Sequence, residues 1–159
     1  MARWSDDRLV NTYGELFQVS AKSVPNATTL PRFAGPDEAV ADITQRYSRF
    51  TSILAPLSTE IVSLRLTPRL AWQMRLADGL AIELGREHGD STPEMRLMRF
   101  VEVYPTQIAT LSRRLKTYVD LRYPQGFAVR DPDIERRVQE RLREELNERG
   151  PLERMRSAA

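Results

Sequence analysis

The sequence has no cysteine and a single histidine, His88. Disulfide frameworks, thiolate nucleophiles and cysteine zinc sites are therefore excluded, although either an oxidising or a reducing compartment remains compatible. One imidazole in a loop segment is far more often an exposed residue than a base or a metal ligand. The sequence also has no glycine-rich phosphate loop, no GxSxG elbow and no SxxK pair. These absences predict a protein that is not an enzyme and binds no cofactor or metal.

Long hydrophobic runs and a charge of one sign are missing too. No stretch of about 18 apolar residues is present, and the first ten residues lack the apolar core of a secretion signal. The 24 basic and 22 acidic residues are interleaved and leave a net charge of only +2, so a concentrated basic surface for nucleic acid is not expected. With 159 residues, of which 41% are hydrophobic, the chain is predicted to be soluble and to form about one domain with a core.

The first third of the chain predicts a hairpin, a loop and a helix. Short apolar pieces on either side of residues 11–14 predict a small hairpin within residues 1–19. Residues 20–36 are rich in Ser, Thr, Asn and Pro and predict a loop. A helix is predicted from Pro36 to near Pro56, because apolar residues then recur at spacings of three and four. Its stripe consists of Val40, Ile43, Tyr47, Phe50 and Leu54.

From Glu60 the apolar period changes to two, which predicts strands. The inner face of the first strand would carry Val62, Leu64 and Leu66, and that of the second Leu70, Trp72, Met74 and Leu76. At the turn near Asp78 and Gly79, a two-residue loop would mix the two faces. A bulged three-residue loop instead pairs Leu76 with Leu80, Met74 with Ile82, and Trp72 with Leu84, so we expect that register.

A second helix is predicted to begin with Thr92 as cap, Pro93 as first residue and Glu94 in the first turn. Its expected core positions are Leu97, Met98, Val101 and Tyr104. Pro105 interrupts the pattern, and Ile108, Leu111 and Leu115 predict a shorter second segment. The whole predicts an α+β fold, with an antiparallel-rich mixed sheet and helices packed on one face.

The stretch YVDLRYPQGFAVR, Tyr118 to Arg130, predicts a terminal hairpin. Val119, Leu121 and Tyr123 would lie on one face, with Asp120 and Arg122 on the other. Pro124 and a left-handed Gly126 suit a three-residue loop with a bulge, followed by a return strand from Phe127 to Val129. No later strand is predicted, so if the return strand lies at the sheet edge, its unpaired backbone groups are a template for another chain.

The composition shifts after the hairpin. A helix is predicted from Asp131 to Arg149, with apolar residues spaced by four and the other faces rich in Arg and Glu. Its charged pairs contribute only tenths of a kcal/mol each, so its stripe needs a surface. That surface could be this domain, a second copy or a partner. The predicted division is therefore a domain of residues 1–130 and a charged helix and tail of residues 131–159.

Several separated motifs of this sequence resemble one known family. They are VDLRYPQGFAV (119–129), RFVEVYP (99–105), AIELGR (81–86), RLAW (69–72), LPRFAGPDEAV (30–40) and the opening ARWSDDRLVNTYGELF. In their order along the chain they resemble the periplasmic β domain of the bacterial cell-division family FtsQ/DivIB, over about residues 2–130.

The resemblance implies a non-enzymatic scaffold of the divisome that links early and late division proteins during septation. Family members have a short cytoplasmic tail, one transmembrane helix in the cell inner membrane, a POTRA domain and then this periplasmic domain, which binds FtsB and FtsL. The chain would then be a soluble fragment lacking the transmembrane helix, with the junction to the missing POTRA domain near residues 1–8. The alternative function is a cell-wall enzyme or an accessory peptidoglycan-binding module.

The resemblance also implies a binding site. Family members bind a segment of FtsB as a strand added to the last β strand. Arg69 matches an arginine that faces acidic partner residues, and Arg122 and Tyr123 match the pair before the turn. Gln125 and Gly126 match turn positions where partner aromatic groups pack, and we include Phe127 of the return strand. The family often has a tryptophan after this strand, which is missing here, and the helix predicted from Asp131 is hypothesised to pack along the domain or near the partner edge.

Overall fold

In a computed structural model the chain forms two compact units, Met1–Val129 and Arg130–Ala159. The structure describes residues 1–4, 8–19, 29–107, 118–123, 126–130, 139–141 and 143, without the side chains of 105–107. In the second unit, residues 139–141 and 143 are helical and exposed. The rest of the helix predicted for 131–149 lies outside the described residues.

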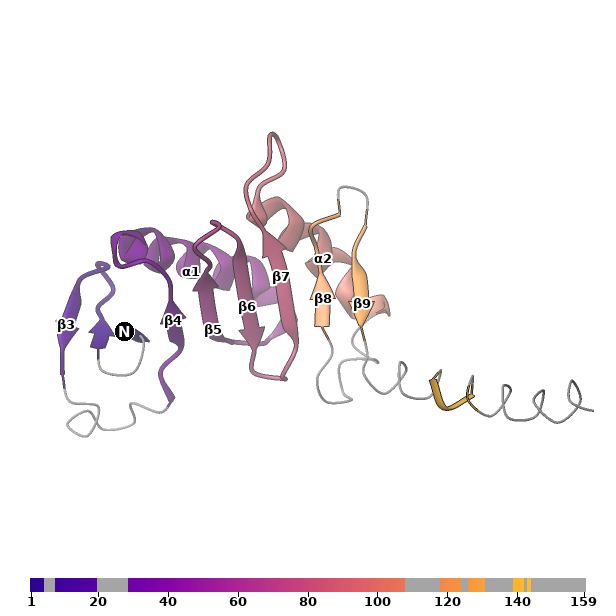
Figure 1. Ribbon diagram of the computed structural model, residues 1–159, viewed down its shortest axis with the longest axis horizontal. Coiled ribbons are helices and arrows are strands. Elements are labelled where there is room, and N and C mark those ends of the chain that lie inside the picture. The colour runs from indigo at the N-terminus through magenta and orange to yellow at the C-terminus, as the bar shows by residue number, and fades with distance from the viewer. Residues whose placement is uncertain are drawn as a thin grey trace, which may run out of the picture. The chain divides into compact units, whose positions relative to one another are not determined.

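A nine-stranded sheet and two helices make up the first unit, except that the last residue of the sheet, Arg130, belongs to the second (Figure 1). The strands are β1 (Ala2–Trp4), β2 (Arg8–Val10), β3 (Leu16–Gln18), β4 (Arg32–Ala34), β5 (Ile61–Leu66), β6 (Trp72–Leu76), β7 (Ala81–Gly85), β8 (Tyr118–Asp120) and β9 (Ala128–Arg130). The helices are α1 (Val40–Leu54), flanked by 3-10 turns at Asp37–Ala39 and Ala55–Leu57, and α2 (Pro93–Gln107).

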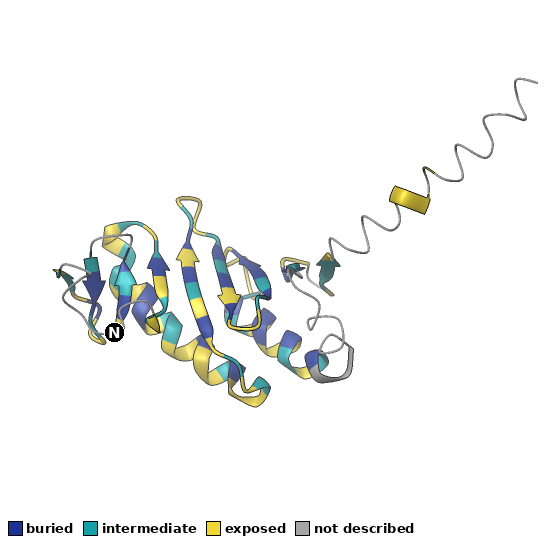
Figure 2. Cartoon of the chain, turned by 90° about the horizontal axis from the view of Figure 1, so that it is seen from below, coloured by how far each residue is buried: buried dark blue, intermediate teal, exposed yellow. Residues whose placement is uncertain are grey.

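The strand order is β3-β2-β1-β4-β5-β6-β7-β8-β9, and the sheet is mixed. β4 lies parallel to both β1 and β5, and β8 lies parallel to β7, whereas the β1–β2, β2–β3, β5–β6 and β6–β7 pairs are antiparallel. α1 and α2 pack against each other and lie on one side of the sheet (Figure 2). The predicted α+β class, the mixed sheet and the helices on one face are confirmed.

The core lies between the sheet and the two helices. Ile43, Phe50 and Leu54 of the predicted α1 stripe are fully buried, as the spacing of three and four requires. Phe50 meets Trp72 of β6 edge to face, with the ring centroids 5.9 Å apart. β5 and β6 contribute mainly alternate residues to the core, whereas the last four residues of β7 are all buried. Figure 2 shows the buried residues of the sheet in dark blue.

The N-terminal hairpin is confirmed, but the loop predicted for residues 20–36 is wrong in part. β2 and β3 form the hairpin, with Leu9 opposite Phe17. β4 lies inside the predicted loop and buries Phe33 between β1 and β5. With only one apolar residue facing inward, so short a strand shows no alternating pattern in the sequence. Residues 20–28 lie outside the described part of the chain.

Two bulges change the predicted strand faces. The register shifts between Ile61 and Ser63, so Ile61 is buried and Val62 is exposed, contrary to prediction. At the β6–β7 hairpin the predicted pairs Leu76–Leu80 and Met74–Ile82 are confirmed. A second shift places Trp72 opposite Gly85, so its predicted pairing with Leu84 is wrong. Each bulge inserts one residue, and this leaves no mark in the apolar period.

The second helix begins as predicted, because Thr92 Oγ1 accepts a hydrogen bond from the backbone N–H of Met95 at 3.2 Å. Phe100, which we did not predict, is fully buried, whereas Met98 is exposed. The predicted interruption at Pro105 is wrong, since α2 continues to Gln107. A proline removes one backbone hydrogen bond from a helix, and the described part of α2 passes through Pro105 without ending there. The predicted segment from Ile108 to Leu115 lies outside the described residues.

The terminal hairpin exists, but its turn differs from the prediction. β8 ends at Asp120 and β9 begins at Ala128, so a longer connection replaces the three-residue loop. Gly126 does not take the left-handed conformation. Val119 and Leu121 are buried as predicted. Tyr123 is 53% exposed, because it lies beyond the end of β8 where strand alternation stops. Asp120, within β8, is buried next to Val119, contrary to the predicted alternation.

Candidate partner-binding site

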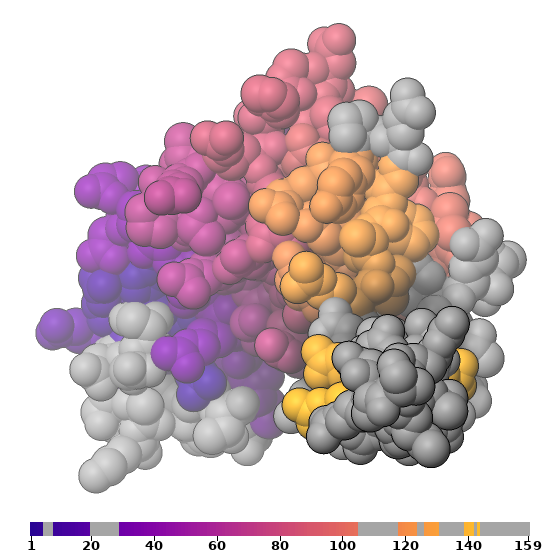
Figure 3. All heavy atoms as spheres, turned by 45° about the vertical axis from the view of Figure 1, so that its right-hand side comes forward, coloured from indigo at the N-terminus to yellow at the C-terminus, as the bar shows by residue number. Residues whose placement is uncertain are grey.

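β9 is the last strand of the sheet, as the sequence predicts. β8 lies on one side of it, and no strand of the described residues lies on the other. β8 and β9 run in opposite directions (Figure 1) and face the viewer in orange in Figure 3. β8 is joined to β7 by parallel pairing that is continued by a 2.9 Å hydrogen bond from Leu121 N–H to Glu83 C=O. An edge strand held in this way offers unpaired N–H and C=O groups to an added strand.

Three arginines from separate loops line an open depression near this edge. Arg69 lies in the β5–β6 loop, Arg86 follows β7 and Arg122 follows β8. Because β6, β7 and β8 are neighbours, these positions meet around a depression of about 610 Å³, whose remaining lining is Ala71, Glu83 and Gly85. We call it the arginine depression. It brings together Arg69 and Arg122, which were predicted site residues, and Arg86, which was not. The only feature of the sequence that could have indicated Arg86 is its position directly after the strand AIELG.

Arg122 is held in place by a carboxylate yet stays accessible. Its Nε and Nη2 donate hydrogen bonds to the two oxygens of Asp120, at 2.9 and 2.6 Å. The hydrogen bond to Asp120, followed by the attraction between the two charges, raises the pKa of Arg122. The Arg122 side chain is 59% exposed, whereas that of Asp120 is 9% exposed. The guanidinium donors that do not face Asp120 are therefore accessible to a second carboxylate.

The Arg122 side chain lies directly against Gly85, in the space that a Cβ at this position would need. Gly85 has a φ of +73°, and a Cβ there would lie 2.7 Å from Arg122 Cγ. Gly85→Ala is expected to destabilise the fold by about 1–3 kcal/mol, measured by urea unfolding, and to displace Arg122. Gly79→Ala is the matched control, because Gly79 also has a positive φ but no atom within 4 Å of the added Cβ. Equal losses in the two variants would show that Arg122 does not depend on Gly85.

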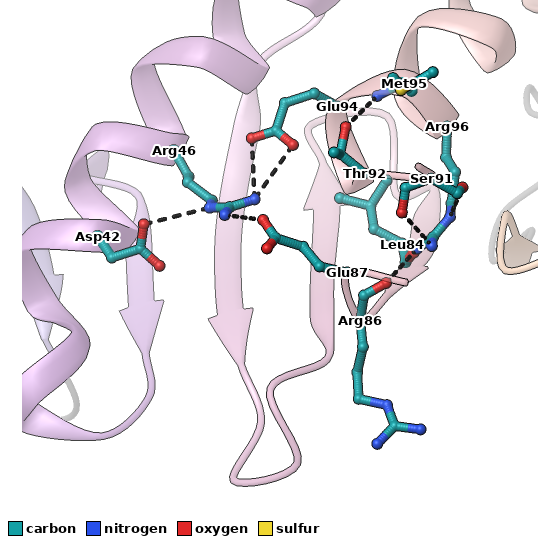
Figure 4. Close-up of polar contacts among 10 residues, drawn as sticks. All are labelled: Asp42, Arg46, Leu84, Arg86, Glu87, Ser91, Thr92, Glu94, Met95 and Arg96. Atoms are coloured by element: carbon teal, nitrogen blue, oxygen red, sulfur yellow. Dashed lines mark hydrogen bonds and ion pairs between the residues drawn. The ribbon is translucent and has the colours of Figure 1, made fainter. Parts of the chain in front are cut away.

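The loop that carries Arg86 is held by a buried arginine of α2, Arg96 (Figure 4). Arg96 Nη1 donates to the carbonyls of Leu84 and Arg86, while Nη2 and Nε donate to the carbonyl and hydroxyl of Ser91. Burial, followed by repulsion from Arg99, lowers the pKa of Arg96. The carbonyl oxygens from the end of β7 thus receive donors from a helix, which orders the loop beside the arginine depression.

A second arginine joins the two helices to the same loop. Arg46 of α1 forms ion pairs with Asp42, Glu87 and Glu94 (Figure 4). Its guanidinium also lies 5.0 Å from the centre of the Trp72 ring. Burial lowers the pKa of Arg46, but the hydrogen bond with Glu87 and the three carboxylate charges raise it overall. The loop that follows β7 is therefore tied to both helices by ion pairs.

The other predicted site residues differ in accessibility. Tyr123 and Gly126 are exposed, and a Cβ at Gly126 would meet nothing within 4 Å. Phe127 is half-buried and packs edge to face on Phe100 at 6.1 Å, so it also anchors the hairpin to α2. Gln125 lies outside the described residues. His88 is exposed and its backbone pairs with Ser91.

Sequence comparison now decides the family. The family model described as "Cell division protein FtsQ/DivIB, C-terminal" matches residues 2–122. The chain belongs to the FtsQ/DivIB family. It is 41% identical over 130 residues to the "Cell division protein FtsQ" of Nitrosospira multiformis, covering 82% of this chain and 51% of that protein. The FtsQ of Escherichia coli is 35% identical over 132 residues, covering 81% of this chain and 46% of that protein.

The chain spans about half the length of the curated FtsQ relatives it matches, including that of Bordetella pertussis, which is 34% identical over 140 residues and covered to 51%. FtsQ proteins are non-enzymatic components of the division machinery, in agreement with the prediction from the missing catalytic motifs. Within the described residues, no helix combines the length and apolar character needed to cross a bilayer. The arginine depression therefore lies within the residues that the family model matches, and β9 follows them.

Proposed function

We propose that this domain is a scaffold that binds FtsB, with FtsL, on the periplasmic side of the inner membrane at the division septum. The partner adds a strand to β9, and its acidic side chains bind Arg122 and Arg69. Backbone pairing supplies affinity that depends little on side chains, and the arginines fix the direction and register of the added strand. The observation that carries the proposal is an edge strand lying beside an arginine depression.

The physical features of the site support this function over ligand capture by a closed pocket. The depression is open, its basic groups come from three loops, and the nearest carboxylates are already used. Asp120 accepts from Arg122, and Glu83 accepts a 2.7 Å hydrogen bond from the Gln73 amide. Exposed Tyr123 adds an aromatic side chain of the kind that interfaces favour.

Calorimetric titration with the soluble periplasmic segments of FtsB and FtsL tests the proposal. The parent chain should bind, and Arg69→Glu and Tyr123→Ala should each weaken binding by roughly tenfold or more, since charge reversal and loss of an exposed aromatic remove interface contacts. Arg69 and Tyr123 are both exposed, so the two variants should keep the Tm of the parent.

Matched controls lie elsewhere on the sheet. Arg75→Glu reverses an exposed arginine on β6, and Tyr13→Ala removes an 85% exposed tyrosine beside β3, at the opposite edge. Both should leave the affinity unchanged. Equal weakening by Arg69→Glu and Arg75→Glu would show that the affinity depends on the net charge of the domain and not on a contact with Arg69. No binding by the parent would refute the proposed function.

A further inference from the structure

Two hairpin loops of this sheet have the same backbone hydrogen bonds but carry different residues at the position with positive φ. In the β5–β6 loop, Leu70 N–H donates to Thr67 C=O and Thr67 N–H to Ala71 C=O. In the β6–β7 loop, Gly79 N–H donates to Leu76 C=O and Leu76 N–H to Leu80 C=O. Leu70 and Gly79 are thus equivalent, with φ values of +58° and +91°. Such bulged loops favour glycine at this position, and the second loop has one.

Leucine at this position is unfavourable for the fold in two independent ways. The left-handed backbone brings its Cβ close to the following carbonyl oxygen. Its side chain is also 63% exposed, although we predicted it to face the core. The loop hydrogen bonds involve only backbone groups and the Thr67 hydroxyl, so a glycine would preserve them. The local fold therefore gives no reason for a leucine here.

The surroundings of Leu70 connect it to the candidate site. Leu70 lines a depression of about 380 Å³ whose apolar part consists of Leu66, Leu70 and Trp72, and Arg86 lines both this depression and the arginine depression. Arg69, the residue before Leu70, also lines the arginine depression. An apolar anchor point is thus continuous with a cationic one. β6 and β9 are three strand spacings apart, about 14 Å, so a strand on β9 alone does not reach Leu70.

We infer that Leu70 is an apolar anchor for a second segment of the partner that adds to β9, a segment with an apolar side chain next to an acidic one. The apolar side chain packs on Leu70, and the acidic one meets Arg69 or Arg86. This inference rests on the proposed function and extends the interface from the sheet edge across the ends of β7 and β8. Burial of Leu70 on binding would offset its unfavourable exposure in the free domain.

The test uses the full chain and the same FtsB and FtsL segments. Leu70→Gly should raise the Tm by about 2–4 °C, because the backbone strain is relieved, and weaken binding by roughly tenfold or more. Leu70→Met keeps an apolar side chain and should retain most of the affinity. Gly79→Leu places the same strained leucine in the other loop, and should lower the Tm while leaving the affinity unchanged.

A rise in stability together with a loss of affinity is the result that a purely structural role does not produce. If the parent binds and Leu70→Gly binds equally well, the inference is wrong while the proposed function stands. If Leu70→Gly lowers both the Tm and the affinity, Leu70 serves the fold and the inference is also wrong. Failure of the parent to bind removes the proposed function, and this inference with it.

Discussion

Arg96→Ala should destabilise the first unit by about 3 kcal/mol, lowering the Tm by roughly 6–12 °C. Arg96 is only 5% exposed, and its guanidinium donates hydrogen bonds to the carbonyl oxygens of Leu84, Arg86 and Ser91. Removing it leaves carbonyl oxygens near the end of β7 without donors and opens a cavity beneath the loop. Urea unfolding followed by circular dichroism measures the change.

Two variants separate this effect from general damage to α2. Glu102→Ala changes an exposed residue of the same helix and should alter the free energy of unfolding by no more than about 0.5 kcal/mol. Arg96→Lys keeps the charge but not the planar arrangement of donors, and should recover only part of the loss. Full stability in Arg96→Lys would show that charge, and not the set of hydrogen bonds, is what the loop requires.

Proline substitution along β9 should separate the folding role of this strand from its binding role. Backbone N–H groups of an edge strand point alternately toward the neighbouring strand and toward the open side. Among Ala128→Pro, Val129→Pro and Arg130→Pro, substitutions at positions facing β8 should lower the Tm. Those facing outward should keep the Tm and weaken FtsB and FtsL binding by roughly a hundredfold, because the added strand loses an N–H donor and meets the proline ring.

The opposite edge of the sheet supplies the control for this series. Phe17→Pro changes the middle of β3, the other terminal strand, and should leave the affinity of the folded protein at the parental value. If every β9 variant that keeps its Tm also keeps its affinity, the partner binds through side chains alone. Strand addition would then be rejected, even if the arginine variants lose binding.

Long periodic segments of the fold could be predicted from the sequence, whereas local irregularities could not. The stripe from Val40 to Leu54 has four turns in which to repeat, and the alternation from Trp72 to Leu76 faces one continuous core. β4 has three residues and gains its place only from pairing with β1 and β5, which lie far from it in sequence. The exposure of Val62 depends on a bulge, which pattern analysis does not detect.

The candidate site was predictable to a similar degree. The edge strand and the two arginines followed from the hairpin pattern and the family resemblance. The burial of Asp120 and the contact of Arg122 with Gly85 depend on how β7 and β8 lie side by side, so no local signal reveals them. Leu70 was predicted to be in the core because it continues an alternating pattern, yet the turn extends through Leu70 and β6 begins only at Trp72.

The strand order also has a consequence for how the sheet is assembled during synthesis. From β4 onward, each later strand lies beside the one that precedes it in the sequence. A chain emerging from its N-terminus can therefore extend the sheet in the order in which its residues appear, with β7 as a temporary edge until β8 arrives. β9, the strand that we propose as the partner's docking edge, is the last of the nine to emerge. The docking edge is thus complete only when the sheet that supports it is already in place.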